Sequence, residues 1–168
     1  IDKVDYGFIS HLHTDHYGGF ISLIHHNRIS RIIKPAIDSA NQRDLKLENY
    51  LNEKEIPFSY YKDGIDSIGN VRIYTLSDTR NNFFTRSSTN DKSAVFKIVY
   101  GKKSILFTGD AETRAERYLA ENFNNFLKTD ILKAGHHGSK TSSSERFMDY
   151  VNPDLVLISA GVLNKFNH

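Results

Sequence analysis

The chain has 168 residues, enough for one domain with a hydrophobic core and too few for two domains of ordinary size. Its net charge of +2 is too small to indicate binding to nucleic acid or to a membrane surface. A basic binding face would therefore require Lys and Arg to gather at one place on the surface. The absence of Cys excludes disulfides, thiolate zinc sites and Cys nucleophiles. No apolar run approaches the ~20 residues of a membrane-spanning helix, and no signal-peptide pattern opens the chain.

The first part of the chain alternates predicted strands and helices. Strands are expected over residues 4–10, 29–37 and 58–61, and helices over 20–24 and 38–55. Pro35 lacks an amide hydrogen, so it limits the second strand to a sheet edge or to an early end. Ser39 is a suitable cap for the second helix, whose Leu47, Tyr50 and Leu51 form an apolar stripe.

The second part begins with several strands. Strands are expected over residues 71–76, 93–100, 104–108, 131–134 and 155–159, and helices over 111–123 and 142–151. The polar stretch 77–92 is long for a simple connection between two elements, and loops of this kind are more often functional or mobile. This order predicts an α/β (α+β) fold, in which sheet is layered with helices, rather than a doubly wound parallel sheet.

The motif His11-Leu12-His13-Thr14-Asp15-His16 concentrates three imidazoles and a carboxylate in six residues. In an extended run His11 and His13 project to one side and can bind one cation, and a turn after Thr14 would let Asp15 and His16 face a second. Imidazole and carboxylate suit zinc, and carboxylate also suits manganese. The alternative is a solvated polar loop after a strand.

This motif, followed by Gly18-Gly19, resembles the signature loop of the metallo-β-lactamase superfamily. Residues 105–110, Ile-Leu-Phe-Thr-Gly-Asp, resemble the strand that ends in the family's bridging aspartate. Residues 132–144, with Gly135-His136-His137-Gly138-Ser139, are similar to a segment of the branch that includes the hydrolase domain of bacterial competence DNA-uptake proteins (the ComEC/Rec2 group). Residues 164–168 resemble that branch's Asn-Arg-Tyr-Gly-His-Pro stretch. The resemblance implies a single αββα sandwich over residues 1–168, incomplete at both ends.

The resemblance also implies a site for two divalent ions, zinc or manganese. Its ligands would be His11, His13, Asp15, His16, Asp110, His136 and His137, with one of the last two left over to protonate the leaving group or to hold a phosphate. A carboxylate shared by two cations lowers their repulsion, which suits Asp110, although Gly-Asp after a strand is also a common turn and helix cap. Asp15 would orient the attacking water as well as bind metal.

Residues 88–93 contain no His where many superfamily members have a further ligand. Asp91 or a water would take its place, and we expect the first ion to bind weakly. Further candidates for substrate binding are Ser139, Lys140, Asp91 and His168, and for phosphate contacts Arg80 and Arg86, although charged loop residues often only face water. Neighbouring helical residues point ~100° apart, so His25 and His26 are expected to be surface residues. Residues 142–144 are expected to cap the helix that follows, with a phosphate contact as the alternative.

These features predict hydrolysis by a metal-bound hydroxide, and the branch resemblance favours a phosphodiesterase or nuclease that acts on single-stranded DNA during competence uptake. One alternative is a small-molecule phosphodiesterase or esterase, because similar motifs occur in a phosphorylcholine esterase. The other is a non-catalytic module that binds DNA or a partner. The chain begins at Ile1 and its only methionine is Met148, so we expect a fragment. The resemblance implies a soluble domain of a bacterial inner-membrane protein.

Overall fold

A computed structural model describes residues 2–36, 42–77 and 81–161, apart from the side chains of Asn82 and Thr85. The chain forms two compact units, Ile1–Tyr61 and Lys62–His168. In the described part of the chain, no helix combines the length and apolar character needed to cross a membrane.

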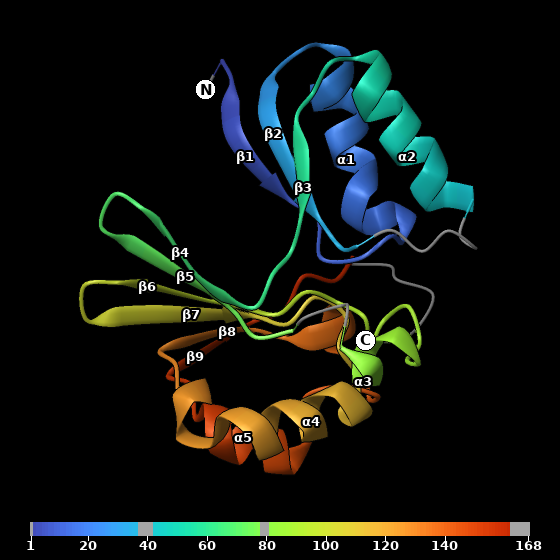
Figure 1. Ribbon diagram of the computed structural model, residues 1–168. Helices are drawn as coiled ribbons and strands as arrows, with labels where there is room; N and C mark the ends of the chain where they lie inside the picture. Colours follow the sequence, from blue (N-terminus) through green and yellow to red (C-terminus); the bar gives the residue numbers. More distant parts are fainter. Residues whose placement is uncertain (1, 37–41, 78–80, 162–168) are drawn as a thin grey trace. The chain divides into compact units, whose positions relative to one another are not determined.

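The first unit is a parallel sheet with two helices packed on it (Figure 1). Its elements are β1 (Val4–Phe8), α1 (Thr14–His25), β2 (Ile29–Lys34), α2 (Gln42–Glu53) and β3 (Phe58–Tyr60), with strand order β1-β2-β3. Each helix makes the crossover that two parallel neighbours require. Both helices share one core with the strands, whose buried members are Ile9, Leu12, Ile24, Ile29, Ile32, Leu47, Leu51 and Ile56.

Two expectations for this unit need correction. The strand β2 ends at Lys34, immediately before Pro35, so the early end is confirmed, but β2 pairs with both β1 and β3 and the edge position is wrong. The helix expected over residues 20–24 begins six residues earlier, at Thr14, so the extended run after β1 reaches only His13 (φ −86°, ψ 145°). Asp15 therefore lies in the first helical turn, where the helix dipole favours a negative charge. Ser39 lies outside the described residues.

A buried ion pair joins α2 to β2. The Lys34 Nζ atom lies 2.6 Å from Asp44 Oδ1 and 2.9 Å from Glu48 Oε1, and neither Lys34 nor Asp44 is exposed. Burying a charge is costly unless it is paired and hydrogen-bonded. The pair therefore orients α2 on the sheet.

The second unit is a six-stranded mixed sheet in the order β4-β5-β6-β7-β8-β9. Strands β4 to β7 are antiparallel, and β7, β8 and β9 are parallel. The strands are β4 (Gly64–Ile68), β5 (Val71–Thr75), β6 (Phe96–Tyr100), β7 (Lys103–Phe107), β8 (Ile131–Lys133) and β9 (Leu155–Leu157), and the helices are α3 (Asn82–Thr85), α4 (Thr113–Phe123), η1 (Asn124–Leu127), η2 (Gly135–Gly138) and α5 (Glu145–Val151). The predicted layering of helices on mixed sheet is confirmed.

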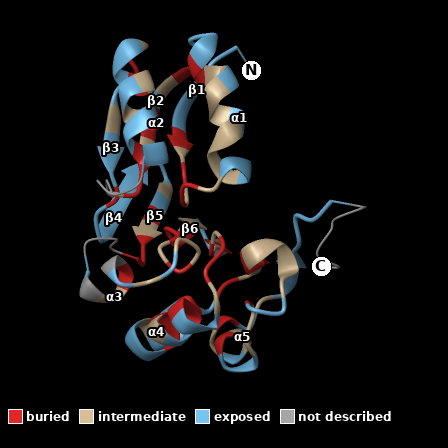
Figure 2. Cartoon of the chain, turned by 90° about the vertical axis from the view of Figure 1, so that its right-hand side faces the viewer, coloured by how far each residue is buried: buried red, intermediate tan, exposed pale blue. Residues whose placement is uncertain are grey.

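The helices α4 and α5 lie together on one face of this sheet (Figure 1). Figure 2 shows buried and exposed faces on both helices. The buried residues of the shared core are Leu76, Val95, Leu106, Ala111, Ala115, Leu119, Ala120, Leu127, Leu132, Phe147 and Val151. The core thus holds α4 beneath the strands that lead to the candidate site.

A carboxylate from α4 binds the N-terminus of α5. Glu116 is 1% exposed and accepts hydrogen bonds from the backbone N–H groups of Ser143 and Ser144, the latter at 2.9 Å. The side chain of Ser144, the N-cap residue, makes no capping hydrogen bond, so the expected serine capping is wrong at that position. Ser142 Oγ donates instead to the backbone oxygens of Gly135 (2.7 Å) and Ser139 (3.0 Å).

Candidate metal centre

The first unit gathers the His/Asp motif at the carboxyl end of β1. Ser10 Oγ lies 3.2 Å from the Nδ1 atoms of both His11 and His16, which leaves the Nε2 atoms of these rings on the opposite side. His11 Nε2 faces His13 Nδ1 at 3.0 Å, and Asp15 Oδ2 lies 3.5 Å from His16 Nε2. The structure thus brings together four predicted ligands, with His11 buried and Asp15 exposed.

The spacing of these nitrogens fits a metal-binding group. Two nitrogens bound to one tetrahedral zinc at ~2.0–2.1 Å would lie ~3.3 Å apart. The 3.0 Å between His11 Nε2 and His13 Nδ1 is close to that separation. The extended backbone at His13 makes this possible, because residues two apart in an extended segment project to the same side.

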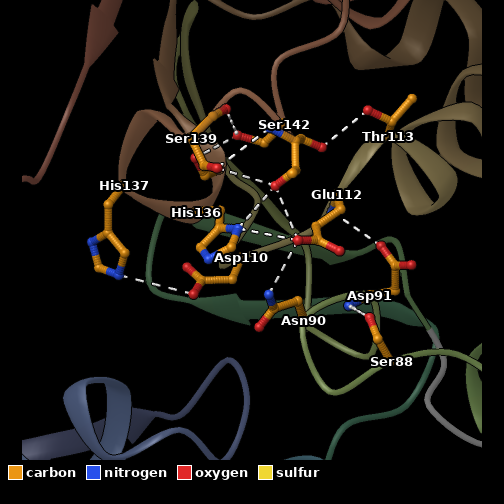
Figure 3. Close-up of polar contacts among 12 residues, drawn as sticks. Ser88, Asn90, Asp91, Asp110, Glu112, Thr113, His136, His137, Ser139 and Ser142 are labelled. Carbon is orange, nitrogen blue, oxygen red and sulfur yellow. Dashed lines mark hydrogen bonds and ion pairs between the residues drawn. The ribbon is translucent and has the colours of Figure 1, made fainter. Parts of the chain in front are cut away.

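The second unit places Asp110 and the His-His pair at one edge of its sheet. The parallel strands β7 and β8 have their carboxyl ends at the same edge, so the segments that follow them meet there. Asp110 is 3% exposed, and its backbone N–H donates to Ser93 Oγ at 2.9 Å. Its Oδ2 lies 3.9 Å from His137 Nε2 (Figure 3). Two atoms each ~2.1 Å from one tetrahedral ion would lie ~3.4 Å apart, so this pair would have to close by about 0.5 Å to share an ion.

The backbone of the His-His pair is strained. His136 (φ 44°, ψ 48°) and His137 (φ 56°, ψ 23°) are both in the left-handed region, which costs a residue with a side chain about 1–2 kcal/mol. A hydrogen bond from His136 N to Gly109 O at 3.2 Å helps to hold the turn. Strain of this kind is common at functional sites, where surrounding structure fixes an unfavourable conformation.

The two imidazoles differ in what their Nδ1 atoms contact. His137 Nδ1 lies 2.7 Å from the Ser159 carbonyl oxygen, which only accepts, so Nδ1 carries a proton. In the neutral ring the lone pair is then on Nε2, the atom that faces Asp110. His136 Nδ1 instead lies 3.2 Å from Glu112 Oε1 and 3.1 Å from Thr141 Oγ1.

Residues 88–93 lie against Glu112 (Figure 3). Asp91 is 4% exposed; its Oδ1 accepts from Glu112 N at 3.0 Å, and its own N–H donates to Ser88 Oγ at 3.1 Å. Asn90 Nδ2 donates to Glu112 Oε1 at 3.3 Å. The structure therefore gives Asp91 a role in holding this loop, and its proposed metal or substrate contact stays a prediction.

The remaining candidates lie around this centre or outside it. Ser139 Oγ is 3.2 Å from Thr141 Oγ1, and Lys140 and Arg86 are exposed. His26 Nδ1 contacts Ser22 O at 2.8 Å, and both His25 and His26 are exposed, as predicted. Arg80 and His168, with the rest of residues 164–168, lie outside the described residues.

Sequence reasoning missed several residues that shape the site. They are Ser10, Asn90, Glu112, Lys133 and Thr141. Burial lowers the pKa of the Lys133 ammonium, while the charge of Asp110 opposes that shift, so Lys133 lies close enough to the predicted bridging carboxylate for the two charges to interact. In the sequence, only Ser10 and Glu112 could have been noticed, because each lies close to a motif residue. The contacts of Glu112 could not have been predicted, because its partners come from loops far apart in the chain.

The fold and these clusters agree with a comparison against protein families. The model of the metallo-beta-lactamase superfamily matches residues 1–162, so the chain belongs to that superfamily. Two solved structures share the fold: CmlA, a diiron beta-hydroxylase from Streptomyces venezuelae (TM-score 0.58, 17% identity, 93% of this chain and 35% of that one), and the metallo-beta-lactamase fold protein YhfI from Bacillus subtilis (TM-score 0.58, 15% identity, 93% and 66%).

The chain is also similar to competence proteins. It is 30% identical to ComE operon protein 3 of Bacillus subtilis over 169 residues (100% of this chain, 21% of that protein) and 28% identical to competence protein ComA of Neisseria gonorrhoeae over 168 residues (100% and 22%). It is 45% identical to recombination protein 2 of Haemophilus influenzae over 89 residues (52% and 11%). The chain thus spans between 11% and 22% of these relatives, and the predicted resemblance is confirmed.

Proposed function

We propose that this chain is a divalent-ion-dependent phosphodiesterase that cuts single-stranded DNA during DNA uptake. Membership of the metallo-beta-lactamase superfamily supports the hydrolytic chemistry, and the likeness to competence proteins supports DNA as the substrate. The observation that carries the proposal is the pairing of His137 Nε2 with Asp110 Oδ2, beside a second imidazole held on a carboxylate.

The proposed ligands come from both units. They are His11, His13, Asp15 and His16 from the first unit and Asp110 and His137 from the second, with Asp110 shared between two ions. Both units contain His and Asp side chains of the type that holds zinc or manganese. Such ions, when bound, lower the pKa of a bound water and polarise the bond that is cut. We expect the first ion to bind more weakly, because residues 88–93 supply no His.

We assign the two histidines of the pair to different roles. His137 is the ligand, because its Nδ1 proton is donated to a carbonyl and its Nε2 faces Asp110. His136 faces the substrate with its Nδ1 beside Glu112. In the imidazolium form, which carries a second proton on Nε2, it gives that proton to the departing oxygen and is left as the neutral ring, or it donates a hydrogen bond from Nε2 to a phosphate oxygen. Asp15 orients the attacking water in addition to binding metal.

Basic side chains around the site would hold the DNA backbone. Lys140 and Arg86 are exposed, Ser139 precedes Lys140 in the chain, and Arg80 and His168 are further candidates. Contacts to phosphates carry no base information, so cleavage should tolerate any sequence and weaken as salt rises. We further propose that the parent protein is a bacterial inner-membrane protein that exposes this domain to incoming DNA.

The test is an activity screen on the metal-loaded chain. Labelled single- and double-stranded DNA, bis-aryl phosphates, a choline phosphodiester and a lactone are incubated with zinc or manganese, with Asp15→Ala as the blank. Cleavage of single-stranded DNA that Asp15→Ala lacks supports the proposal. Turnover of only the small esters would replace it with a small-molecule esterase, and no turnover with ions bound would favour a non-catalytic binding module.

A further inference from the structure

We infer that Glu112 is a positioning residue for His136: its carboxylate fixes the ring so that Nε2 is presented to the substrate. The expected effect on catalysis rests on the proposed function, whereas the contacts between Glu112 and His136 lie entirely within the second unit. No motif in the sequence assigned a role to Glu112.

One carboxylate oxygen of Glu112 is the centre of a network (Figure 3). Its Oε1 accepts from Thr141 Oγ1 at 3.0 Å and from Asn90 Nδ2 at 3.3 Å, and it lies 3.2 Å from His136 Nδ1. The backbone N–H of Glu112 is held by Asp91 Oδ1 at 3.0 Å. Both ends of the residue are therefore fixed by the loops that carry the candidate site.

The directions of these hydrogen bonds set the tautomer of His136. The Thr141 hydroxyl has one hydrogen and donates it to Glu112, so toward His136 Nδ1 it can only accept. Both neighbours of Nδ1 are thus acceptors, and Nδ1 must carry a proton. Nε2 lies on the opposite side of the ring, the side that we assign to the substrate, as when a carboxylate orients a catalytic imidazole in a hydrolase triad.

The position of Glu112 in its helix argues against a merely local role. It is the N-cap of α4 (φ −100°, ψ 176°), where Ser, Thr, Asp and Asn are favoured because their short side chains cap the helix. The Glu112 side chain makes no capping hydrogen bond. Its carboxylate extends away from the helix end and contacts His136 instead, so the residue type serves the imidazole and not the helix.

The test compares three variants of the full chain, which are Glu112→Ala, Glu112→Gln and the surface control Glu121→Gln. For Glu112→Ala we expect kcat on single-stranded DNA to fall ~10- to 100-fold, the range for lost carboxylate partners of functional histidines, with KM within about twofold. Ion content measured by mass spectrometry should stay at the wild-type value. Glu112→Gln keeps an acceptor oxygen and should recover part of kcat, and Glu121→Gln should match wild type.

The second readout is independent of turnover. Two-bond ¹H–¹⁵N correlation spectra of the imidazoles, with His136→Gln to assign the signal, should show Nδ1 protonated in wild type and in Glu112→Gln. In Glu112→Ala this signature should be lost. A fixed tautomer together with unchanged kcat in Glu112→Ala overturns the inference, and so does loss of bound ions. If wild type cleaves no DNA while the tautomer still depends on Glu112, the proposed function fails and the positioning contact stands.

Discussion

Asp110 is a nearly buried carboxylate whose Oδ2 lies 3.9 Å from His137 Nε2. Asp110→Asn removes a charge that would offset two cations, but it keeps the volume and one acceptor oxygen. We expect kcat to fall by at least ~100-fold, the order of effect when one catalytic charge partner is removed, with the melting temperature changed by only a few degrees. Steady-state kinetics at saturating zinc or manganese measure kcat, and thermal melts of ion-free samples measure the melting temperature.

The matched control is Asp149→Asn, which removes an exposed carboxylate from α5 in the same unit. Its kcat and melting temperature should equal those of wild type. Activity of Asp110→Asn within about twofold of wild type at saturating ions would show that Asp110 does not bridge them.

Gly135 opens the turn that carries His136 and His137. A Cβ added there would lie 2.9 Å from Ala111 O, 3.2 Å from Ser142 Cβ and 3.3 Å from Thr108 Oγ1. The nearest atom is backbone, which cannot move aside as a flexible side chain can. We expect Gly135→Ala to destabilise the chain by ~1–3 kcal/mol, the usual cost of overpacking, as measured by urea unfolding.

Gly19→Ala is the contrasting change, because a Cβ at that helical glycine meets nothing within 4 Å. It should stabilise α1 by ~0.5–1 kcal/mol, the difference in helix propensity between Gly and Ala. Equal effects of the two substitutions would contradict the close approach inferred at Gly135.

At the residue scale, the sequence predicted which side chains lie together better than it predicted their backbone conformations. The spacing of His11, His13 and His16 was enough to predict that these imidazoles gather, because three His at that spacing rarely occur by chance. The left-handed backbone of His136 and His137 was not predictable, because even His, which is enriched among non-glycine residues in this region, adopts it rarely, and the surrounding turn imposes it here. Glu112 was missed for a similar reason, since its partners lie up to 29 residues away in sequence.

At the scale of elements, α5 depends on a carboxylate from α4. Burial raises the pKa of Glu116 above its ordinary value of 4.5, although hydrogen bonds from Ser143 and Ser144 act in the opposite direction. The folded chain therefore holds this proton more tightly than the unfolded chain. The corresponding stability is fully present below the unfolded pKa and is lost as pH rises through the raised folded pKa.

Glu116→Gln is neutral at every pH, so it removes this contribution. Between pH 4 and pH 7, a range that runs from about half a unit below the ordinary pKa to about two and a half units above it, we expect wild type to lose free energy of unfolding relative to the variant. Urea unfolding at several pH values gives the difference. The raised pKa of Glu116 would be contradicted if the free energy of unfolding of wild type, minus that of the variant, stayed constant or increased as the pH rises.

Most of the elements that the sequence predicted have a buried face, although β9, whose three residues are all exposed, was also predicted, from its apolar run. Pro35 ended β2 where expected because it has no amide hydrogen for the ladder. The strand β4 was missed, since all five of its residues are exposed and it shows no alternation of buried and exposed positions. The short helix α3 lies in a polar stretch without helical periodicity, and its start is fixed locally by Asn81, whose side chain accepts from Phe83 N.

For the whole molecule, the order of elements was enough to predict the fold class. Alternating strands and helices at both ends, with antiparallel strands between them, admit few layered arrangements. The ligand set is a different matter, because residues more than 90 positions apart in sequence would have to share ions. The proposal that His11 to His16 act with Asp110 and His137 therefore depends on the family relationship, and it needs a test that does not use catalysis.

Ion binding provides that test. If both units supply ligands, zinc or manganese should stabilise both, by ~2.7 kcal/mol at a free concentration 100 times Kd. Hydrogen exchange should slow in α1 and in residues 135–138 alike, and either Asp15→Ala or Asp110→Asn should abolish the effect in both places. His25→Ala, which removes an exposed imidazole from the end of α1, is the matched control and should leave the stabilisation unchanged.

Titration calorimetry then resolves the two ions. We expect one tight ion and one that is weak or absent, because residues 88–93 supply no imidazole to complete the first site. A nitrogen ligand lost from a tetrahedral set leaves water in its place, which lowers affinity for that ion alone. Two equally tight ions would mean that another side chain completes the first site. Protection limited to one unit would show that the ions bind there without ligands from the other, and the shared site would have to be abandoned.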